Sequence, residues 1–173
     1  MSNANHFFKL IKHPIKFRMF LLTKLPSAFF CGVRVVDINE EICSVKVPYK
    51  WLSTNPFKST YFACLSMAAE MSTGVLALAH IHNRKPSVSM LVLKVEGNFI
   101  KKAIAKTTFI CTDGLAIKQT IEEAIKTGEG KAITTTSIGK NDAGEIVAEF
   151  FITWSFKTNS ISSSSNCRIQ RAV

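Results

Sequence analysis

A long apolar segment with a single carboxylate constrains this chain more than any other feature. Residues 61–81 are apolar at nearly every position, and Glu70 is the only ionised side chain among them. A helix that is hydrophobic on all sides either spans a membrane or is enclosed by other elements of a protein core. Because Glu70 lies at the centre, alanine and serine are frequent, and the flanks carry no one-sided positive cluster, we predict a core helix over residues 61–82.

The carboxylate of Glu70 has two interpretations. Burial disfavours the charged form of a carboxyl group, so a Glu in a core helix either has a structural partner or takes part in chemistry. Asn55 precedes the helix in a loop, and a helix start presents free backbone N–H groups. An amide, N–H donors and a buried carboxylate are the parts of a hydrolytic site, so we expect Glu70 to face a pocket beside Asn55.

Strand patterns flank the predicted helix on both sides. Residues 33–38 and 42–49 predict a hairpin, and Ser59 or Thr60 is the expected N-cap of the helix that follows. Four strands are expected after the helix, with a bulge near Gly97 in the first of them and helical spacing at residues 117–126. These strands cover residues 88–99, 103–111, 132–139 and 146–156.

The N-terminal segment mixes basic and apolar residues. Lysine and arginine interrupt residues 6–30 too often for a secretory signal. We predict an amphipathic helix that begins near Pro14 and ends at Pro26. Two placements stay open, packing over the domain or weak contact with a membrane surface. The expected inner side consists of Ile15, Met19, Phe20 and Leu22.

The bulk composition fits one domain with an anionic partner. A chain of 173 residues with 47% hydrophobic residues can bury a sizeable core. We divide it into an N-terminal helical segment (1–30), a domain (31–157) and a Ser- and Asn-rich disordered tail (158–173). The net charge of +10 suggests an anionic ligand, but its bases are scattered and form no nucleic-acid motif, so a phosphate-bearing small molecule is favoured over nucleic acid.

The five cysteines form neither a C-x-x-C pair nor a metal-ligand cluster with the four histidines. This pattern predicts reduced thiols in a cytoplasmic protein, and we expect no metal and no cofactor. Cys64 sits at the predicted helix start, where a thiol is either activated or a small core residue.

Several motifs carry a resemblance to a known family. They are residues 55–62 (NPFKSTYF), 68–70 (AAE), Gly74, 144–148 (GEIVA) and 153–157 (TWSFK). From about residue 26 to 157 the chain resembles hotdog-fold acyl-CoA thioesterase-like proteins of the phenylacetyl-CoA and 4-hydroxybenzoyl-CoA type. The resemblance agrees with the element order and implies an α+β hotdog fold. In this fold a curved antiparallel sheet of five or six strands wraps one long apolar helix, here with an added N-terminal helix.

The resemblance also implies roles for individual residues. Glu70 corresponds to the family's helix acid, Asn55 to a polar residue fifteen positions earlier, and the backbone N–H of Phe62 to an oxyanion donor eight positions earlier. The chain departs from the family at the helix start, where Tyr61-Phe62-Ala63 replaces His-Gly-Gly. The departure separates two hypotheses, a hydrolase of acyl-CoA thioesters and a non-catalytic protein that binds an acyl-CoA or fatty-acyl ligand.

Coenzyme A carries phosphates, and Lys101, Lys102 and Lys106 are the residues we expect to meet them. Surface charge for solubility is the alternative role for each lysine. The resemblance further implies a homodimer or a dimer of dimers, with active sites at the subunit interface.

Overall fold

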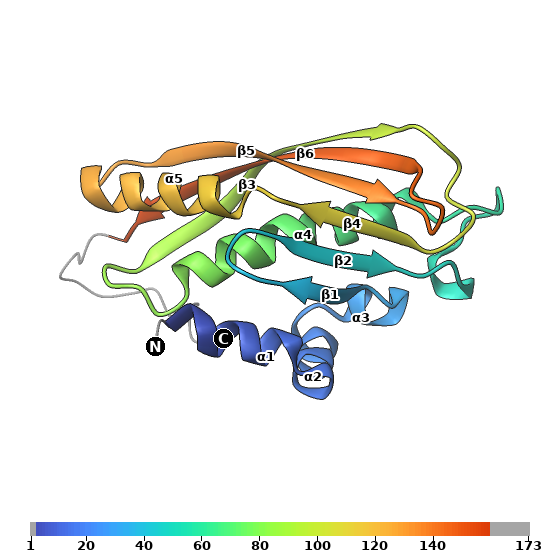
Figure 1. The fold of residues 1–173 in the computed structure, drawn as a ribbon, viewed down its shortest axis with the longest axis horizontal. Coiled ribbons are helices and arrows are strands. Elements are labelled where there is room, and N and C mark those ends of the chain that lie inside the picture. The colour runs from blue at the N-terminus through green and yellow to red at the C-terminus, as the bar shows by residue number, and fades with distance from the viewer. Residues whose placement is uncertain (1–2, 160–173) are drawn as a thin grey trace.

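The apolar segment forms one enclosed helix, α4 (Phe62–Ile81), in the computed structural model, which describes residues 3–159 (Figure 1). Among the described residues, α4 is the one helix whose length and composition would let it cross a membrane. However, 67% of its most apolar window is buried inside the protein. The prediction of a core helix is therefore confirmed.

Six antiparallel strands form a single sheet over α4 (Figure 1). The strand order is β1-β2-β4-β5-β6-β3, and α4 packs against β2, β4 and β5. This is the predicted α+β hotdog architecture, with β1 and β3 at the two edges. The strands are β1 (Arg34–Ile38), β2 (Cys43–Val47), β3 (Val88–Phe99), β4 (Thr107–Cys111), β5 (Lys131–Lys140) and β6 (Ile146–Thr158).

Alternation along the strands explains which face covers α4. In β2 the buried side chains are Cys43, Val45 and Val47, the set that the period-two pattern predicts. In the long strand β6, Phe150, Ile152, Trp154 and Phe156 are buried in the same way. The aromatic and β-branched side chains of this face supply most of the apolar area that holds α4 against the sheet.

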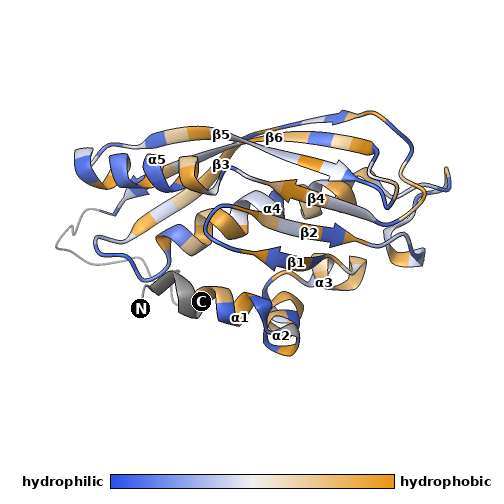
Figure 2. Cartoon of the chain, viewed as in Figure 1, coloured by the Kyte–Doolittle hydropathy of each residue, from blue (hydrophilic) through white to orange (hydrophobic). Residues whose placement is uncertain are grey.

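A second helix, α5 (Gly114–Thr127), lies beside α4 and packs against β5 and β6. Its apolar side chains Ile117, Ile121 and Ala124 are buried, as their helical spacing predicted. Figure 2 shows the blue and orange turns of this amphipathic helix. The turn between β1 and β2 packs directly on its first residue, because a Cβ at Gly114 would lie 2.2 Å from the carbonyl oxygen of Glu40.

Three helices precede the sheet where the sequence predicted one. They are α1 (Asn3–Lys12), α2 (Pro14–Lys24) and α3 (Pro26–Cys31), and α1 and α2 lie on the side of α4 away from β5 and β6 (Figure 1). Pro14 and Pro26 begin helices α2 and α3, since the first turn of a helix tolerates proline.

The predicted inner side of α2 is wrong in part. Phe20 and Leu22 are half-buried, and Phe20 packs against the core as expected. Ile15 and Met19 are exposed, whereas Phe17 and Leu21 are buried. Both pairs have the same four-residue spacing, so α2 carries two apolar stripes and periodicity alone does not show which one packs. The buried stripe is the one that faces α1 and α4.

The bulge in β3 also differs from the expectation. It lies between Val92 and Lys94 and not at Gly97. Gly97 instead provides room for the ring of Phe150, since a Cβ there would lie 2.8 Å from that ring. At the other end of the chain, Thr158 is the last residue of β6, and the rest of the predicted disordered tail from residue 160 lies outside the described residues.

We expect Leu76→Ala to lower the free energy of unfolding by about 2–5 kcal/mol, because Leu76 is fully buried in the C-terminal half of α4 and its loss leaves a cavity. Leu115→Ala on the exposed side of α5 is the matched control, with an expected change within about 0.5 kcal/mol. Urea denaturation measures both values. Equal effects of the two substitutions would contradict the enclosed position of α4.

Candidate functional site

Asn55 shapes the loop that leads into α4. Its Oδ1 accepts hydrogen bonds from the backbone N–H of Phe57 at 3.0 Å, from the N–H of Ser59 at 3.2 Å and from the hydroxyl of Ser59 at 3.1 Å. Within residues 3–159 the Nδ2 group of Asn55 donates no hydrogen bond. The side chain therefore holds the loop with its oxygen, and its nitrogen has no protein acceptor within residues 3–159.

The predicted N-cap of α4, Ser59 or Thr60, is wrong. The N-cap is Tyr61. Tyr61 has extended backbone angles and makes no side-chain capping bond. The hydroxyl of Ser59 bonds to Asn55, and the backbone of Thr60 pairs with Thr54 in a short β-bridge, which places Thr60 one residue before the N-cap position. In the described part of the chain, the N–H groups of the first two helical residues therefore have no acceptor.

A buried hydroxyl lies next to these free N–H groups. Thr60 is 4% exposed, and within the described residues its Oγ1 has no hydrogen-bond partner. A second buried hydroxyl of this kind, on Thr107, belongs to β4. Leaving a buried hydroxyl without a partner costs about 1–3 kcal/mol, so a ligand or water that bonds to Thr60 gains free energy.

The loop and the end of β3 enclose a cavity of about 790 Å³, which we call the loop pocket. Asn55, Thr60 and Phe62 line it, together with the exposed rings of Phe57 and Phe99. The positive end of the α4 dipole lies at this pocket, and it favours negative charge on a bound group. The pocket thus combines an apolar lining with polar donors at one place.

Glu70 lines a different cavity, of about 320 Å³, which we call the helix cavity. Its walls come from α4, from α1 and α2, and from Met90 of β3. Within residues 3–159 the Glu70 carboxyl makes neither a hydrogen bond nor an ion pair, and burial raises its pKa above the usual value for Glu. A Cβ on Gly74 would lie 2.9 Å from Oε1 of Glu70, so this glycine makes room for the carboxyl group.

The expectation that Glu70 and Asn55 share one pocket is wrong within a single chain. Glu70 follows Phe62 by eight residues, which separates them by about 12 Å along the helix and turns them about 80° apart. Asn55 and Phe62 line the loop pocket, whereas Glu70 lines the helix cavity. The structure thus brings two of the three predicted catalytic residues together and leaves the third apart.

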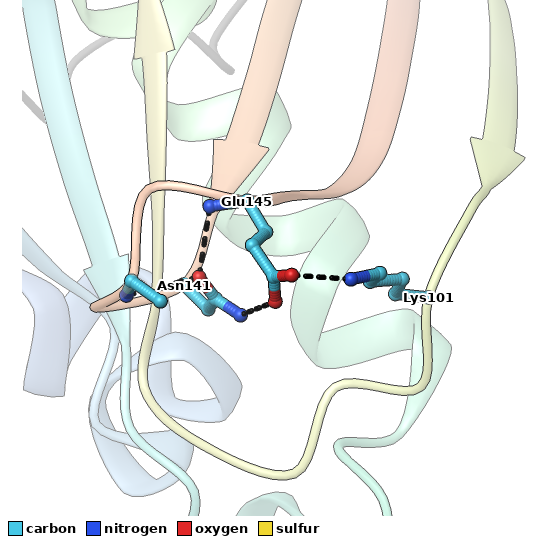
Figure 3. A network of polar contacts seen from close by, with 4 residues as sticks. Lys101, Asn141 and Glu145 are labelled. Atoms are coloured by element: carbon cyan, nitrogen blue, oxygen red, sulfur yellow. Dashed lines mark hydrogen bonds and ion pairs between the residues drawn. The ribbon is translucent and has the colours of Figure 1, made fainter.

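The three predicted phosphate-binding lysines differ in their surroundings. Lys101 pairs with Glu145, whose carboxylate is also held by Asn141 (Figure 3), and Lys106 pairs with Asp142 at 2.7 Å. Lys102 has no ion pair within residues 3–159. Lys101 and Lys102 line the loop pocket, and Lys106 does not.

The thiol of Cys64 is not activated by the helix start. Burial, followed by its contact with Cys31, raises its pKa to about 12, and the two sulfur atoms lie 3.4 Å apart. A neutral thiol of this kind is a core residue. Among the described residues, no group of three His, Cys, Asp or Glu side chains is placed to hold a metal ion.

Sequence reasoning missed two contributors to the site. Thr60 was considered only as a helix cap, and its unpaired hydroxyl depends on how the loop folds. Gly74 lies four residues after Glu70, and this spacing on one helix face was a signal that the glycine makes room for the carboxyl group.

Comparisons with solved structures show which known proteins share this fold. A protein of unknown function from Pseudomonas aeruginosa, described as a probable thioesterase, is 18% identical and superposes with a TM-score of 0.69 over 91% of this chain and 97% of its own. A protein of unknown function from Chlorobaculum tepidum is 15% identical, with a TM-score of 0.71 over 84% and 94% of the two chains. A thioesterase from Haemophilus influenzae is 12% identical, with a TM-score of 0.60 over 83% and 90%.

At these identities the likeness shows the fold, which is that of the thioesterase-like hotdog proteins. No curated protein matches the sequence. Residues 15–156 match a family described as a domain of unknown function, DUF4442, and the chain belongs to that family. The match begins after α1 and includes both Asn55 and Glu70.

We expect Glu70→Gln to stabilise the protein more at about pH 8 than at about pH 4.5. The raised pKa in the folded state means that the folded protein holds its proton more tightly than the unfolded chain. The contribution of Glu70 to stability is therefore complete below the unfolded pKa near 4.5 and is lost as the pH rises through the folded pKa. Urea denaturation over this pH range measures the difference.

The matched control is Glu123→Gln, which removes an exposed carboxylate of α5. A stability difference between Glu70→Gln and wild type that does not change with pH would contradict the unpaired, buried state of the Glu70 carboxyl.

Proposed function

We propose that this protein hydrolyses acyl-CoA thioesters at sites shared by two subunits of a homodimer. The observation that carries the proposal is the unpaired Glu70 carboxyl in an apolar cavity, combined with free N–H donors in a separate pocket. A buried carboxyl without a partner is unfavourable for folding, which supports a functional role. The names of the solved thioesterases agree with this class of reaction.

The edge strand β3 supports the dimer. Among the described strands, β3 pairs only with β6, so the other edge of this twelve-residue strand is open. On the face that β3 shares with the core side of β6, Val95 and Phe99 are 50% and 53% exposed. An open edge with exposed apolar side chains invites pairing with another strand, and a second copy of this chain supplies one.

Antiparallel pairing of β3 with its copy also explains why the site is divided. Met90 lines the helix cavity near one end of β3, and Phe99 lines the loop pocket at the other end. A two-fold axis that passes between Lys94 and Val95 would place Phe99 of one subunit beside Met90 of the partner subunit. The loop pocket of each subunit would then adjoin the helix cavity of the other.

In this arrangement the groups of both subunits act on one thioester. The N–H of Phe62, with that of Ala63, would polarise the carbonyl and stabilise the negative charge that develops on its oxygen. Glu70 of the partner subunit would take a proton from water as the water attacks the carbonyl carbon, and Asn55 would orient the water through Nδ2. The C–S bond then breaks, and the proton passes to the thiolate, giving a carboxylic acid and free coenzyme A.

Lys102 is the strongest of the three candidates for a phosphate contact, because it lines the loop pocket and has no ion pair within residues 3–159. Lys101 and Lys106 would each have to break an ion pair, with Glu145 and Asp142 respectively, before binding a phosphate. The four described cysteines are free, which supports a reducing compartment, and we propose that the protein is cytoplasmic.

A second candidate function is binding of an acyl ligand without hydrolysis. Phe62 favours binding without hydrolysis. Its side chain is 56% exposed and lines the loop pocket, at a position where the acyl-CoA thioesterases that this chain resembles have glycine. Binding of an acyl-CoA by the wild type without release of free thiol, over a series of chain lengths, would identify this function and exclude the hydrolase.

If the hydrolase proposal is correct, Glu70→Gln lowers kcat for acyl-CoA hydrolysis by about 100- to 10,000-fold, because the amide cannot accept the proton of water. Asn55→Ala lowers kcat less, by about tenfold, since it removes orientation and not the base. A thiol-release assay measures both rates. Unchanged hydrolysis by Glu70→Gln would exclude this mechanism.

Hybrid dimers test whether the site is shared. Glu70→Gln subunits co-expressed with Asn55→Ala subunits under a second affinity tag give hybrids in which one site has both intact residues and the other has neither. These hybrids should recover about half of the wild-type rate. Each site would carry one defect if it lay within a single subunit, and such hybrids would show no recovery.

The dimer itself should dissociate in the Val95→Lys variant, because a charge on the core-side face of β3 would be buried by the partner. Val36→Lys on the other edge strand, β1, is the matched control, and it should remain dimeric. Sedimentation velocity at micromolar concentration distinguishes the two states. A monomeric wild type would contradict the proposed assembly.

A further inference from the structure

We infer that the helix cavity binds the apolar chain of an acyl group, and that helices α1 and α2 set the length of chain that fits. This inference rests on the proposed function, because it assigns the tail of the substrate whose thioester Glu70 would hydrolyse. Its tests use binding of free fatty acids, which does not depend on hydrolysis.

The walls of the helix cavity suit a hydrocarbon chain. They are apolar except for Glu70 and His82, which α4 contributes twelve residues apart, or about 18 Å along the helix. The ring of His82 packs against Phe7 of α1, with 5.0 Å between the ring centroids. With the His82 ring packed on Phe7, the Glu70 carboxyl is left to contact a polar group, and the rest of the lining matches a long apolar tail.

Water is a poor occupant of this cavity. A buried water makes about three hydrogen bonds to polar groups, and the apolar walls do not provide them. The volume of about 320 Å³ corresponds to about ten groups of the size of water, each about 30 Å³. A methylene group has nearly this size, so the cavity suits an acyl chain of about ten carbons.

Glu70 accounts for the polar end of the ligand. Its carboxyl has no partner within residues 3–159, and Gly74 keeps open the space that the carboxyl occupies. In its neutral form the carboxyl can donate a hydrogen bond to the carboxylate of a free fatty acid, the ligand that the tests below use. The start of the chain would then lie at Glu70, and the methyl end would lie deeper between α4 and the N-terminal helices.

The N-terminal helices supply the wall opposite α4. Phe7, Leu10 and Ile11 come from α1, and Phe17, Phe20 and Leu21 come from α2. The family match begins at residue 15, so α1 lies outside it. The wall that sets chain length is therefore built from α1, which precedes the matched region, and from α2, which falls within it.

The first experiment measures the affinity of the full-length protein for saturated fatty acids of increasing length by calorimetry. Affinity should rise about fourfold for each added methylene and stop rising near ten carbons. Leu10→Trp should narrow the cavity, move this limit about two carbons shorter and weaken decanoate binding about fifteenfold. Leu115→Trp, on the exposed side of α5, is the matched control. This variant should bind decanoate with the affinity of the wild type.

The second experiment enlarges the cavity. Phe20→Ala should move the limit to longer chains, whereas Phe30→Ala, on an exposed ring of α3 outside the cavity, should not. Thermal unfolding of each variant confirms that it is folded. The Phe20→Ala variant keeps the inference testable even if Leu10→Trp fails to fold.

The outcomes separate this inference from the proposed function. Fatty-acid binding with the predicted shifts but no acyl-CoA hydrolysis would support the cavity and overturn the hydrolase. Hydrolysis with no fatty-acid binding, or with the same length limit in wild type, Leu10→Trp and Phe20→Ala, would support the hydrolase and overturn the assignment of the cavity.

Discussion

The rest of the structure depends on the burial of α4. A helix whose apolar side chains lie on every side has to be covered all round, and one sheet covers only part of it. In this protein the sheet covers α4 through β2, β4 and β5, α5 packs beside it, and the N-terminal helices cover the remaining side. Each of these elements gains stability mainly from contact with α4 or with the sheet that encloses it.

The same burial makes Glu70 exceptional. A carboxyl group in this position lacks the solvation that stabilises its charge, and no neighbour among the described residues replaces that solvation. The protein accepts this cost where α4 meets the N-terminal helices, at the helix cavity. Glu70 is thus both part of the packing around α4 and the proposed general base.

Much of the fold was predictable from the sequence, because α4 and the strands have strong and distinct periodicities. The predicted core helix, the six strands and α5 agree with the structure to within a few residues. The phase of α2 was not predictable, since its two apolar stripes are equally spaced and only tertiary contacts with α1 and α4 select Phe17 and Leu21. The N-cap was wrong for a related reason, because the fold of the loop binds the Ser59 hydroxyl to Asn55 and holds the Thr60 backbone in a bridge with Thr54, so the helix begins after Tyr61.

The position of α1 has a consequence for how this protein can diverge. A mutation in the sheet or in α4 disturbs packing that the whole fold needs, so few substitutions there are tolerated. A mutation in the cavity-facing side chains of α1 changes one wall of the helix cavity and leaves the β-sheet contacts of α4 in place. Phe7 and Ile11 are buried, whereas Leu10 is 41% exposed, so Leu10 is the α1 position where the cavity can change shape at the smallest cost in folding stability. If the proposed function is correct, this position is where ligand preference is freest to evolve.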